Sequence, residues 1–459
     1  MPSVLWLRRD LRRHDHPALG AAAAESGDVV ALYVLDPVLW DGAGDVRRAW
    51  LARSLAAFDS SLGGRLVVRH GDPRTVVPEV AAAARAATVH VSADHAPYGV
   101  RRDDAVEEAL VADGRRLERT GSPYAVSPGR VRKGDGTPYR VYTPFYRAWL
   151  AHGWRAPAPD ADPEWVARTR GPLSSQGIPA APDLGVTVLG EVGERAALER
   201  WDRFRAASLD RYDELRDRAD LDGTSMLSAH LRWGELHPRT LLAELGDSPA
   251  HTVFRKELAW REFYADVLHH NPTSAREYLR PELAAMEYDT GPAAGARFEA
   301  WSQGRTGYPF VDAGMRQLLA EGWVHNRVRM VVASFLVKDL HLEWTQGARW
   351  FMRWLRDGDL ASNQHGWQWV AGTGTDAAPY YRVFNPVLQG LKFDPDGGYV
   401  RRYVPELASV AGAAVHEPWK LPGGRPPGYP APIVEHDQER RVALARYSAL
   451  ASPVTGPAG

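Results

Sequence analysis

Short apolar runs alternate with Ala-rich stretches over the first 130 residues of the chain. The runs predict buried strands at 4–7, 29–35, 66–68 and 89–92, and the stretches between them predict helices at 47–62, 74–87 and 101–112. This alternation favours an α/β domain with a doubly wound, Rossmann-like parallel sheet. Ligands of such sheets bind at the carboxyl ends of strands, where charged residues 8–10 and Asp94 stand. From position alone, simple solvation of the strand ends explains these charges better.

The pattern changes near residue 153, where proline and glycine begin to recur. They continue to about residue 197, which predicts a long linker laid over the surface. From 198 to 450, apolar residues recur at helical spacing and no β alternation persists, which predicts a large all-helical domain. We therefore expect an α/β domain at 1–130, a linker at 131–197, a helical domain at 198–450 and a disordered tail at 451–459.

Composition places the chain among folded globular proteins, with 44% hydrophobic and 25% charged residues. Its longest apolar stretch, about 330–337, is far shorter than the roughly 20 residues of a membrane span. The N-terminus turns charged after a few apolar residues and is not a secretory signal, so we expect a cytoplasmic protein with no membrane partner. The net charge of −1 neither favours nor excludes nucleic acid, so any basic surface must be local.

Several common kinds of site are excluded by the sequence. The chain has no cysteine, which rules out disulfides, thiolate metal sites and cysteine nucleophiles. It has no P-loop, HExxH or GxSxG motif. Histidine pairs at 14/16 and 269/270 lack further ligands at metal spacing, so we expect no metal site. A GxGxxA pattern at 372–377 follows a predicted helix rather than a strand, which argues against a dinucleotide-binding turn.

One predicted helix carries several polar groups on a single face. Glu257, Trp260, Arg261 and Tyr264 are spaced at i, i+3, i+4 and i+7. Taken alone, a solvated face with Arg261 over Trp260 is the simpler explanation. A binding face is the alternative.

A second predicted helix places Asn326, Arg329 and Met330 on one face. This helix continues into the apolar run at 331–337 and must therefore be buried. A buried arginine needs a carboxylate partner, which Asp357 or Asp359 can supply.

Tryptophan is unusually frequent, with 17 residues against 11 phenylalanines. Trp344, Trp350, Trp354, Trp367 and Trp369 fall within 26 positions. Indoles at this density serve either packing or electron transfer, since an indole stacks well and is oxidisable. The sequence pattern leaves both open.

Long segments of the sequence resemble the photolyase/cryptochrome family. Between 298 and 407 they are FEAWSQGRTGYPFVDAGMRQLLAEGWVHNRVRM, DGDLASNQHGWQWVAGTGTDAAPYYRVFNP and KFDPDGGYVRRYVPEL; KELAWREFY, DGTSMLSAHLRWGEL and the N-terminal LWLRRDLRRHDHPAL fit as well. Motifs this long and in this order are highly specific. The chain is most like bacterial class I cyclobutane pyrimidine dimer photolyases, and the resemblance covers nearly its whole length.

The resemblance implies that FAD binds in a U shape inside the helical domain. Residues that resemble the family's FAD contacts are Tyr212, Thr224, Ser225, Met226, Leu227, Ser228, Arg261, Arg329, Asp357 and Asp359. Thr224 and Ser225 also fit the start of a helix, where N–H groups and hydroxyls meet a pyrophosphate. Asn363 resembles the residue that faces flavin N5; plant cryptochromes carry an acid there, so Asn363 favours repair.

The family's lesion pocket corresponds to Glu257, Trp260, Asn326, Arg327, Met330 and Trp369. The resemblance implies that extruded bases stack on the two tryptophans. Burial would raise the pKa of Glu257, and the neutral acid could donate a hydrogen bond to the carbonyl that gains charge. Arg327, Arg216 and Lys392 would bind phosphates. The Asn326 and Met330 pattern is of the dimer-repair type rather than the (6-4) type.

The family reduces its flavin through three tryptophans. Trp367 resembles the proximal one and Trp344 the middle one. The position of the distal one, ten residues before Trp301, holds Gly291. We predict that Tyr288, which precedes an aspartate as the family's tryptophan often does, is the terminal donor and forms a neutral tyrosyl radical.

The resemblance also implies an antenna chromophore in the α/β domain. Tyr98 and Gly99 stand where folate-binding relatives carry Asn-Glu, whereas the stretch ADHAPYGVRRD resembles the deazaflavin-binding subgroup. Asp94 would accept hydrogen bonds from the ring, and Arg232 would close the site. We expect an 8-hydroxy-5-deazaflavin antenna rather than methenyltetrahydrofolate.

Together these features predict a light-dependent lyase that repairs cyclobutane pyrimidine dimers in UV-damaged DNA with FAD as FADH−. The resemblance implies a monomer without an obligate protein partner. A cryptochrome-like photosensor without repair activity is the alternative from another functional class, and a (6-4) photolyase is a third possibility.

Overall fold

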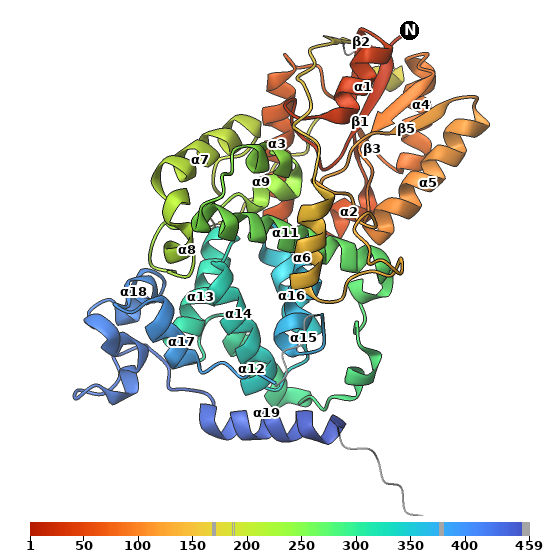
Figure 1. Cartoon of the computed structure of the whole chain (residues 1–459). Coiled ribbons are helices and arrows are strands. Elements are labelled where there is room, and N and C mark those ends of the chain that lie inside the picture. Colours follow the sequence, from red (N-terminus) through yellow and green to blue (C-terminus); the bar gives the residue numbers. More distant parts are fainter. Residues whose placement is uncertain (168–170, 186, 188, 376–380, 452–459) are drawn as a thin grey trace, which may run out of the picture.

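The computed structural model describes residues 1–167, 171–185, 187, 189–375 and 381–451. It has a parallel sheet with its helices at one end and a larger helical part at the other (Figure 1). The predicted fold class is therefore confirmed. The tail, for which the sequence predicts disorder, lies outside the described residues from 452 onward.

The sheet has the strand order β3-β2-β1-β4-β5, and every neighbouring pair is parallel. Its strands are β1 (Ser3–Leu7), β2 (Asp28–Leu35), β3 (Val67–His70), β4 (Thr88–Val91) and β5 (Arg116–Arg119). Four of them lie where the apolar runs predicted strands. A short strand, β6 (Glu164–Trp165), pairs with the beginning of β2. Strands β2 and β3 lie on one side of β1, and β4 and β5 lie on the other side. The loops at the carboxyl ends of β1 and β4 therefore lead in opposite directions, as in other doubly wound sheets.

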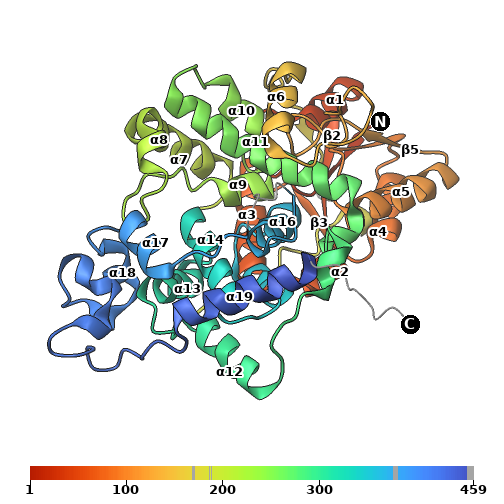
Figure 2. The same cartoon turned by 60° about the horizontal axis from the view of Figure 1, so that its bottom comes forward.

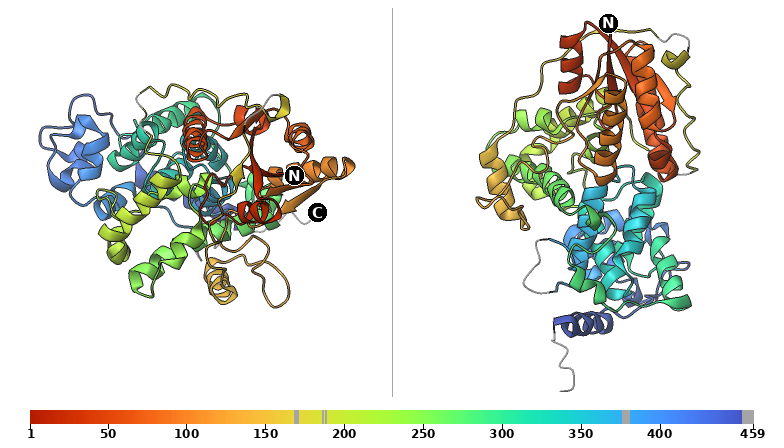
Figure 3. Two further views of the ribbon diagram at one scale, coloured as in Figure 1. Left: turned by 90° about the horizontal axis from the view of Figure 1, so that it is seen from above. Right: turned by 90° about the vertical axis from the view of Figure 1, so that its right-hand side faces the viewer.

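Helices connect the strands and cover both faces of the sheet (Figure 3). They are α1 (Pro17–Glu25), α2 (Pro37–Asp41), α3 (Asp45–Ser61), α4 (Pro73–Ala83) and α5 (Pro97–Ala112). Local sequence starts two of them, because Asp36 and Asp72 each accept a hydrogen bond from the second helical N–H and are followed by proline.

The stretch that links the sheet to the helical part begins with a helix, α6 (Tyr142–His152). It then runs along the α/β domain and makes backbone hydrogen bonds to it, from Val166 N to Val29 O at 3.0 Å and from Gln176 N to Val68 O at 2.8 Å. Backbone pairing of this kind fixes the course of the proline-rich segment.

The helical part is built from α7 (Glu194–Ala207), α8 (Tyr212–Leu215), α9 (Ser228–Trp233), α10 (Pro238–Ala243), α11 (Pro249–His270), α12 (Gly291–Ser302), α13 (Pro309–Glu321), α14 (Asn326–Ser334), the π-helix η5 (Phe335–Asp339), α15 (Trp344–Trp354), α16 (Leu360–Ala371), α17 (Pro386–Phe393), α18 (Gly398–Tyr403) and α19 (His436–Ala451). Helix α19 lies across the end remote from the sheet and packs on η5 (Figures 1 and 2).

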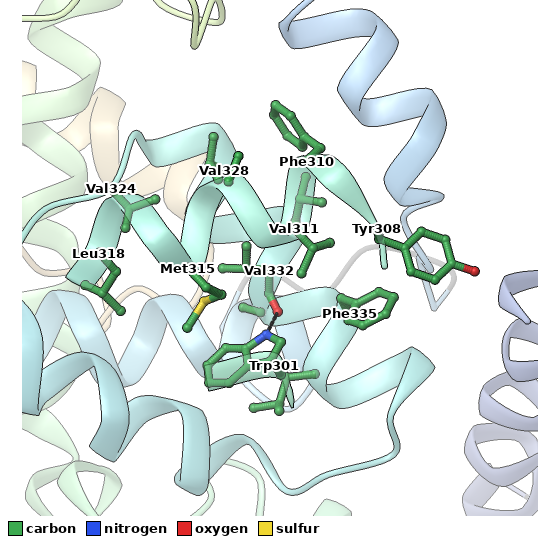
Figure 4. Packing of buried hydrophobic residues seen from close by; sticks show 14 of the residues in the cluster. Trp301, Tyr308, Phe310, Val311, Met315, Leu318, Val324, Val328, Val332 and Phe335 are labelled. Atoms are coloured by element: carbon green, nitrogen blue, oxygen red, sulfur yellow. Dashed lines mark hydrogen bonds between the residues drawn. The ribbon is translucent and has the colours of Figure 1, made fainter. Parts of the chain in front are cut away.

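The largest core of the helical part forms where α12, α13 and α14 meet (Figure 4). Trp301 is fully buried there, and its Nε1 donates to Val332 O at 2.9 Å. A buried indole requires such a partner, since its N–H otherwise loses its hydrogen bond to water. Trp344 is also fully buried in this core. Packing therefore accounts for part of the tryptophan excess.

Candidate active site

Helices α11, α14 and α16 pack together and carry most of the predicted site residues. The ion pair expected for Arg329 is present: its guanidinium donates to Asp357 Oδ2 at 2.7 Å, and its Nε donates to Val324 O at 2.7 Å. Asp357 is therefore the partner that the sequence left open. The other oxygen, Asp357 Oδ1, is buried and has no hydrogen-bond partner among the described residues. A bound group with an N–H or O–H donor would satisfy this oxygen.

Asp359 turns instead toward the α/β domain. It accepts a hydrogen bond from Arg9 at 2.7 Å and caps α16 by accepting from Ser362 N at 3.0 Å. Burial raises the pKa of Asp359, but the charges of Arg9, Arg232 and Arg261 outweigh burial and hold it well below the usual value. One carboxylate therefore both starts α16 and ties the helical part to the end of β1.

Asn363 is buried on α16, one turn before Trp367. Its amide nitrogen donates to Ala348 O at 3.1 Å and to Gln364 Oε1 at 2.8 Å, and Gln364 in turn donates to Ala275 O at 2.7 Å. With its N–H groups engaged, Asn363 presents its oxygen as the acceptor, as the flavin N5 role requires. The structure thus gives Gln364 a function that the sequence did not reveal: it orients Asn363.

The segment expected to bind the pyrophosphate is a loop rather than the start of a helix. Helix α9 begins at Ser228, and Met226 precedes it with a φ of 53°, so the prediction of a helix start at Thr224 and Ser225 is wrong. The reason is tertiary, because Arg200 of α7 holds the backbone of this loop through hydrogen bonds to Ser225 O at 2.9 Å and Thr224 O at 3.1 Å. Sequence reasoning missed Arg200.

The beginning of α9 nevertheless faces the rest of the predicted site. Ser228 accepts a hydrogen bond from Trp323 Nε1 at 3.3 Å, and Trp323 lies beneath the Arg329 guanidinium. Tyr212 is buried on α8 and packs edge-on against Phe254. The segment from 224 to 228 and the Arg329–Asp357 pair are therefore connected through Trp323, which fits a ligand that spans both.

Glu257 on α11 pairs with Arg216, with 2.7 Å between the carboxylate and NH1. Burial raises the pKa of Glu257, and the charges of Arg216 and Arg327 only partly oppose this effect. A glutamate in this state holds a proton more readily than an ordinary one. The expectation of a raised pKa is therefore supported, but Arg216, expected on a phosphate, lies on Glu257 in this structure.

The three expected phosphate-binding cations lie on neighbouring elements. Arg327 donates to Asp217 at 2.6 Å, and Asp217 also contacts Arg216 at 3.4 Å. The Arg327 guanidinium and the Lys392 ammonium lie over the same ring, that of Phe393, at 5.8 and 5.4 Å. The structure therefore brings Arg327 and Lys392 together at one ring, while Asp217 and Glu257 pair with the two arginines.

The polar face of α11 is not a solvated face. Arg261 donates to Pro123 O at 2.9 Å and to Leu231 O at 3.2 Å and lies over Tyr124, not over Trp260. Trp260 is half-buried and stacks on Tyr142 of α6, with ring centroids 3.6 Å apart and planes within 7°. Tyr142 therefore fixes the indole plane from the side of the linker. The simpler explanation offered by spacing alone fails because two other segments cover this helix.

The other expected pocket residues come from α14 and α16. Asn326 is exposed in the first turn of α14, and Met330, one turn later, is half-buried with its sulfur 3.5 Å from Arg327. Trp369 is half-buried on α16. These side chains and Trp260 are accessible to a ligand, whereas the core indoles are not.

Trp367 and Trp344, the expected electron carriers, are both buried. Trp367 packs on α15 at Gly347, where a Cβ would lie 2.2 Å from the indole ring, so glycine is required for this approach. Trp344 stands one turn earlier on α15 and meets the ring of Tyr278 edge-on. Tyr288 is half-buried against the same core. Sequence reasoning missed Tyr278 because its spacing from Trp301 matches no family position.

The expected antenna residues face each other across the boundary between sheet and helices. Asp94, after β4, contacts Arg102 at 3.3 Å, and Arg232 donates to Gly358 O at 3.0 Å. Burial and the neighbouring Arg9 lower the pKa of Arg232 to about 9. The Arg232 NH1 is buried and unpartnered in the described part of the chain, so this side chain retains a free donor.

Within the described ranges, no group of three or more histidine, aspartate or glutamate side chains is arranged to hold a metal ion. None of the helices in these ranges is long and apolar enough to cross a membrane.

The parallel α/β sheet followed by a larger helical part is an architecture found in a known family of flavin-binding proteins. Family models agree: residues 3–164 match that for DNA photolyase, and residues 254–449 match that for the FAD binding domain of DNA photolyase. The chain belongs to the photolyase/cryptochrome family. Its helical part is the FAD-binding part.

Relatives match over nearly the full chain. Deoxyribodipyrimidine photo-lyases of Halobacterium salinarum and Escherichia coli are 39% and 40% identical, and each comparison covers 97% of this chain and 98% of the relative. That of Streptomyces griseus is 41% identical over 95% of this chain and 97% of its own. Identity at this level over the full length supports an enzyme of light-dependent DNA repair.

Solved structures of the family superpose closely on this chain. A bacterial class III photolyase from Agrobacterium tumefaciens has a TM-score of 0.88 at 38% identity, covering 98% of both chains. An archaeal photolyase from Sulfolobus tokodaii with two FAD molecules has a TM-score of 0.84 at 28% identity, covering 98% of this chain and 100% of its own. A Synechocystis cryptochrome has a TM-score of 0.85 at 27% identity, covering 97% and 98%.

Proposed function

We propose that this chain is a light-dependent lyase that splits cyclobutane pyrimidine dimers in UV-damaged DNA. The observation that carries the proposal is Glu257, a half-buried glutamate with a raised pKa that pairs with Arg216 and lies one helical turn before the half-buried Trp260. Bound FAD, as FADH−, supplies the light-driven electron for this reaction. The full-length relatives named as photo-lyases support the same activity.

The chain's residues divide the binding of FAD between two regions. Arg329, Asp357 and Asn363 bind the isoalloxazine, and the unpaired Asp357 Oδ1 accepts from one of its N–H groups. Tyr212 and the loop from 224 to 228 hold the ribose and phosphates. Asp359 and Arg261, also expected to contact FAD, fix α16 and α11 at the boundary with the α/β domain.

The lesion pocket is formed by half-buried and exposed side chains. Trp260, held flat by Tyr142, and Trp369 provide faces for the extruded bases. Neutral Glu257 donates a hydrogen bond to the dimer carbonyl that gains charge. Asn326 and Met330 line the pocket edge, while Arg216, Arg327 and Lys392 bind the flanking phosphates; Arg216 exchanges Glu257 for phosphate as DNA arrives.

We also propose that different domains bind the two chromophores. Residues 1–130 carry the antenna and residues 198–450 carry FAD, with 131–197 as the connection. The enzyme acts as a monomer in the cytoplasm, with damaged DNA as its partner. We assign it to the class I branch on the motifs that it shares with class I enzymes, although the class III photolyase is also 38% identical.

The antenna that we propose is an 8-hydroxy-5-deazaflavin bound between Asp94 and Arg232. The free Arg232 donor supports an anionic or carbonyl group at this position. Denaturing extraction of protein co-expressed with a deazaflavin source, followed by chromatography, tests this assignment. Release of folate, or of a second FAD equivalent as in the Sulfolobus tokodaii structure, would overturn it.

Anaerobic repair of a thymine-dimer oligonucleotide tests the main proposal. The FAD-loaded protein is reduced chemically, illuminated with near-UV light and assayed by chromatography against a dark control. Light-dependent restoration of thymines is expected. Absence of repair despite bound, reduced FAD would favour a cryptochrome-like photosensor, and repair of a (6-4) oligonucleotide alone would assign the other lesion.

A further inference from the structure

Tyr278 contacts the N-cap residue and the first residue of α15. Its ring meets Trp344 edge-on, with centroids 5.8 Å apart and an interplanar angle of 84°. Its hydroxyl donates to Glu343 Oε1 at 3.2 Å. Glu343 is the residue immediately before Trp344, at the N-cap of the helix. The indole therefore contacts the ring of Tyr278, and the carboxylate contacts its hydroxyl.

Among the described residues, Trp344 has no acceptor to which its indole N–H could release a proton. The side chain is fully buried, and its Nε1 has no hydrogen-bond partner among the described residues. An indole that loses an electron in such a place keeps its N–H proton and stays a cation radical. That species is a stronger oxidant than the neutral radical, so it readily takes an electron from a neighbouring aromatic group.

Tyr278 needs a base to be oxidised. Burial, together with Tyr288 and Glu343, raises the pKa of Tyr278 well above its usual value, so the phenol is protonated at any physiological pH. Loss of an electron makes a phenol strongly acidic, and its proton then moves along an existing hydrogen bond. Glu343 provides that bond and is only half-buried, so it can pass the proton on to solvent.

We propose that Tyr278 is the electron donor to oxidised Trp344 and that Glu343 accepts the phenolic proton. One electron passes from Tyr278 to the Trp344 cation radical, and one proton passes from the Tyr278 hydroxyl to Glu343. The products are neutral Trp344, a neutral tyrosyl radical at Tyr278 and protonated Glu343. The inference rests on the proposed function, since the initial oxidant is bound, light-excited FAD in its oxidised form.

This assignment changes the role expected for Tyr288. In the described part of the chain, Tyr288 makes no ring contact with Trp344. It is linked to Tyr278 by a side-chain hydrogen bond as well as by charge, and Tyr381 interacts through charge with Tyr288 and Tyr447. Tyr381 stacks on Tyr447 of α19, with centroids 4.2 Å apart. Tyr288 is therefore a later carrier, placed between Tyr278 and the Tyr381–Tyr447 pair.

Flash photolysis of the oxidised, FAD-loaded protein tests the inference through the identity of the radical. Transient absorption and electron paramagnetic resonance distinguish tyrosyl from tryptophanyl radicals. We expect a tyrosyl radical in the wild type. Tyr278→Phe, which keeps the ring contact but has no hydroxyl, should lose it and leave a short-lived tryptophanyl radical. Tyr139→Phe, at a half-buried tyrosine packed on Phe145, is the matched control and should behave as wild type.

Two further variants separate the steps. Tyr288→Phe should still form the first tyrosyl radical and only shorten its life. Glu343→Gln keeps an acceptor for the hydroxyl but binds a proton poorly, so the tyrosyl radical should form more slowly and lose its sensitivity to replacement of water by deuterium oxide. An undiminished tyrosyl signal in Tyr278→Phe, or its loss in Tyr288→Phe alone, would overturn the proposal.

Repair by the chemically reduced wild-type protein needs none of these electron donors. If radicals form as expected but no dimer is repaired, the proposed function fails and the donor assignment stands. If repair proceeds and Tyr278→Phe retains its tyrosyl radical, the donor assignment fails and the proposed function stands. The two conclusions are therefore tested independently.

Discussion

Two aromatic regions of the helical part differ in what surrounds their indoles. Around Glu257, which pairs with Arg216, Trp260 is half-buried and stacked on one face by Tyr142. Around α15, Trp344 and Trp367 are buried among apolar side chains, and the nearest acid, Glu343, contacts Tyr278 rather than an indole. An indole with one open face can stack a base, whereas an enclosed indole can only pack or exchange electrons. Burial, not residue type, separates the two roles.

The largest expected difference between the two regions is in stability. Trp301→Ala in the core should lower the free energy of unfolding by about 3–5 kcal/mol, because it leaves a cavity and an unpaired Val332 carbonyl. Trp260→Ala should cost only about 1–2 kcal/mol, since part of that side chain is already in contact with water. Urea unfolding followed by circular dichroism measures both. Equal losses would contradict the distinction.

The affinity for damaged DNA should depend on the half-buried indole of the pocket. Trp260→Ala should weaken affinity for a dimer-containing oligonucleotide by about 1–3 kcal/mol, or roughly 5- to 150-fold, because one stacking face is lost. Trp154→Ala removes another half-buried indole, stacked on Trp149 at 4.5 Å, and serves as the control with unchanged affinity. Fluorescence anisotropy in the dark measures binding without repair. Equal affinities of Trp260→Ala and wild type would remove Trp260 from the pocket.

The pH dependence of repair should show whether Glu257 acts as a neutral acid. Because the pKa of Glu257 is raised, its neutral, hydrogen-bond-donating form persists at higher pH than for an ordinary glutamate. Repair should fall as pH rises through that pKa, and Glu257→Gln, which donates at any pH, should flatten the profile. Arg216→Met removes a charge that lowers this pKa and should move the fall to higher pH. Identical profiles in wild type and Glu257→Gln would exclude the neutral acid.

The smallest expected effect concerns the basic surface. Lys392→Ala should weaken binding to damaged and undamaged DNA alike and reduce the slope of log affinity against log salt by about 1, as for the loss of one phosphate contact. Lys420→Ala, at a lysine paired with Glu417 at 2.6 Å, is the control. A loss of affinity confined to damaged DNA would place Lys392 inside the pocket instead.

The sequence predicted some of the side-chain contacts in the site but not others. Burial of Arg329 followed from the apolar run after it, so a carboxylate partner could be expected, but the choice between Asp357 and Asp359 could not. The two differ by only two positions, and the outcome depends on Arg9, which arrives from the end of β1. The polar face of α11 was misjudged from spacing alone for a similar reason, because α6 and the loop before it cover that face.

The sequence by itself determined four of the six described strands, the absence of thiol chemistry and, through long motifs, the family. These depend on near neighbours in the chain, where periodicity and capping act. Only the tertiary structure decided that Arg200 holds the 224–228 loop, that Gln364 orients Asn363 and that Tyr278 rather than Tyr288 meets Trp344. Such contacts join segments far apart in sequence, and their geometry is fixed by how the helices pack, which no local pattern records.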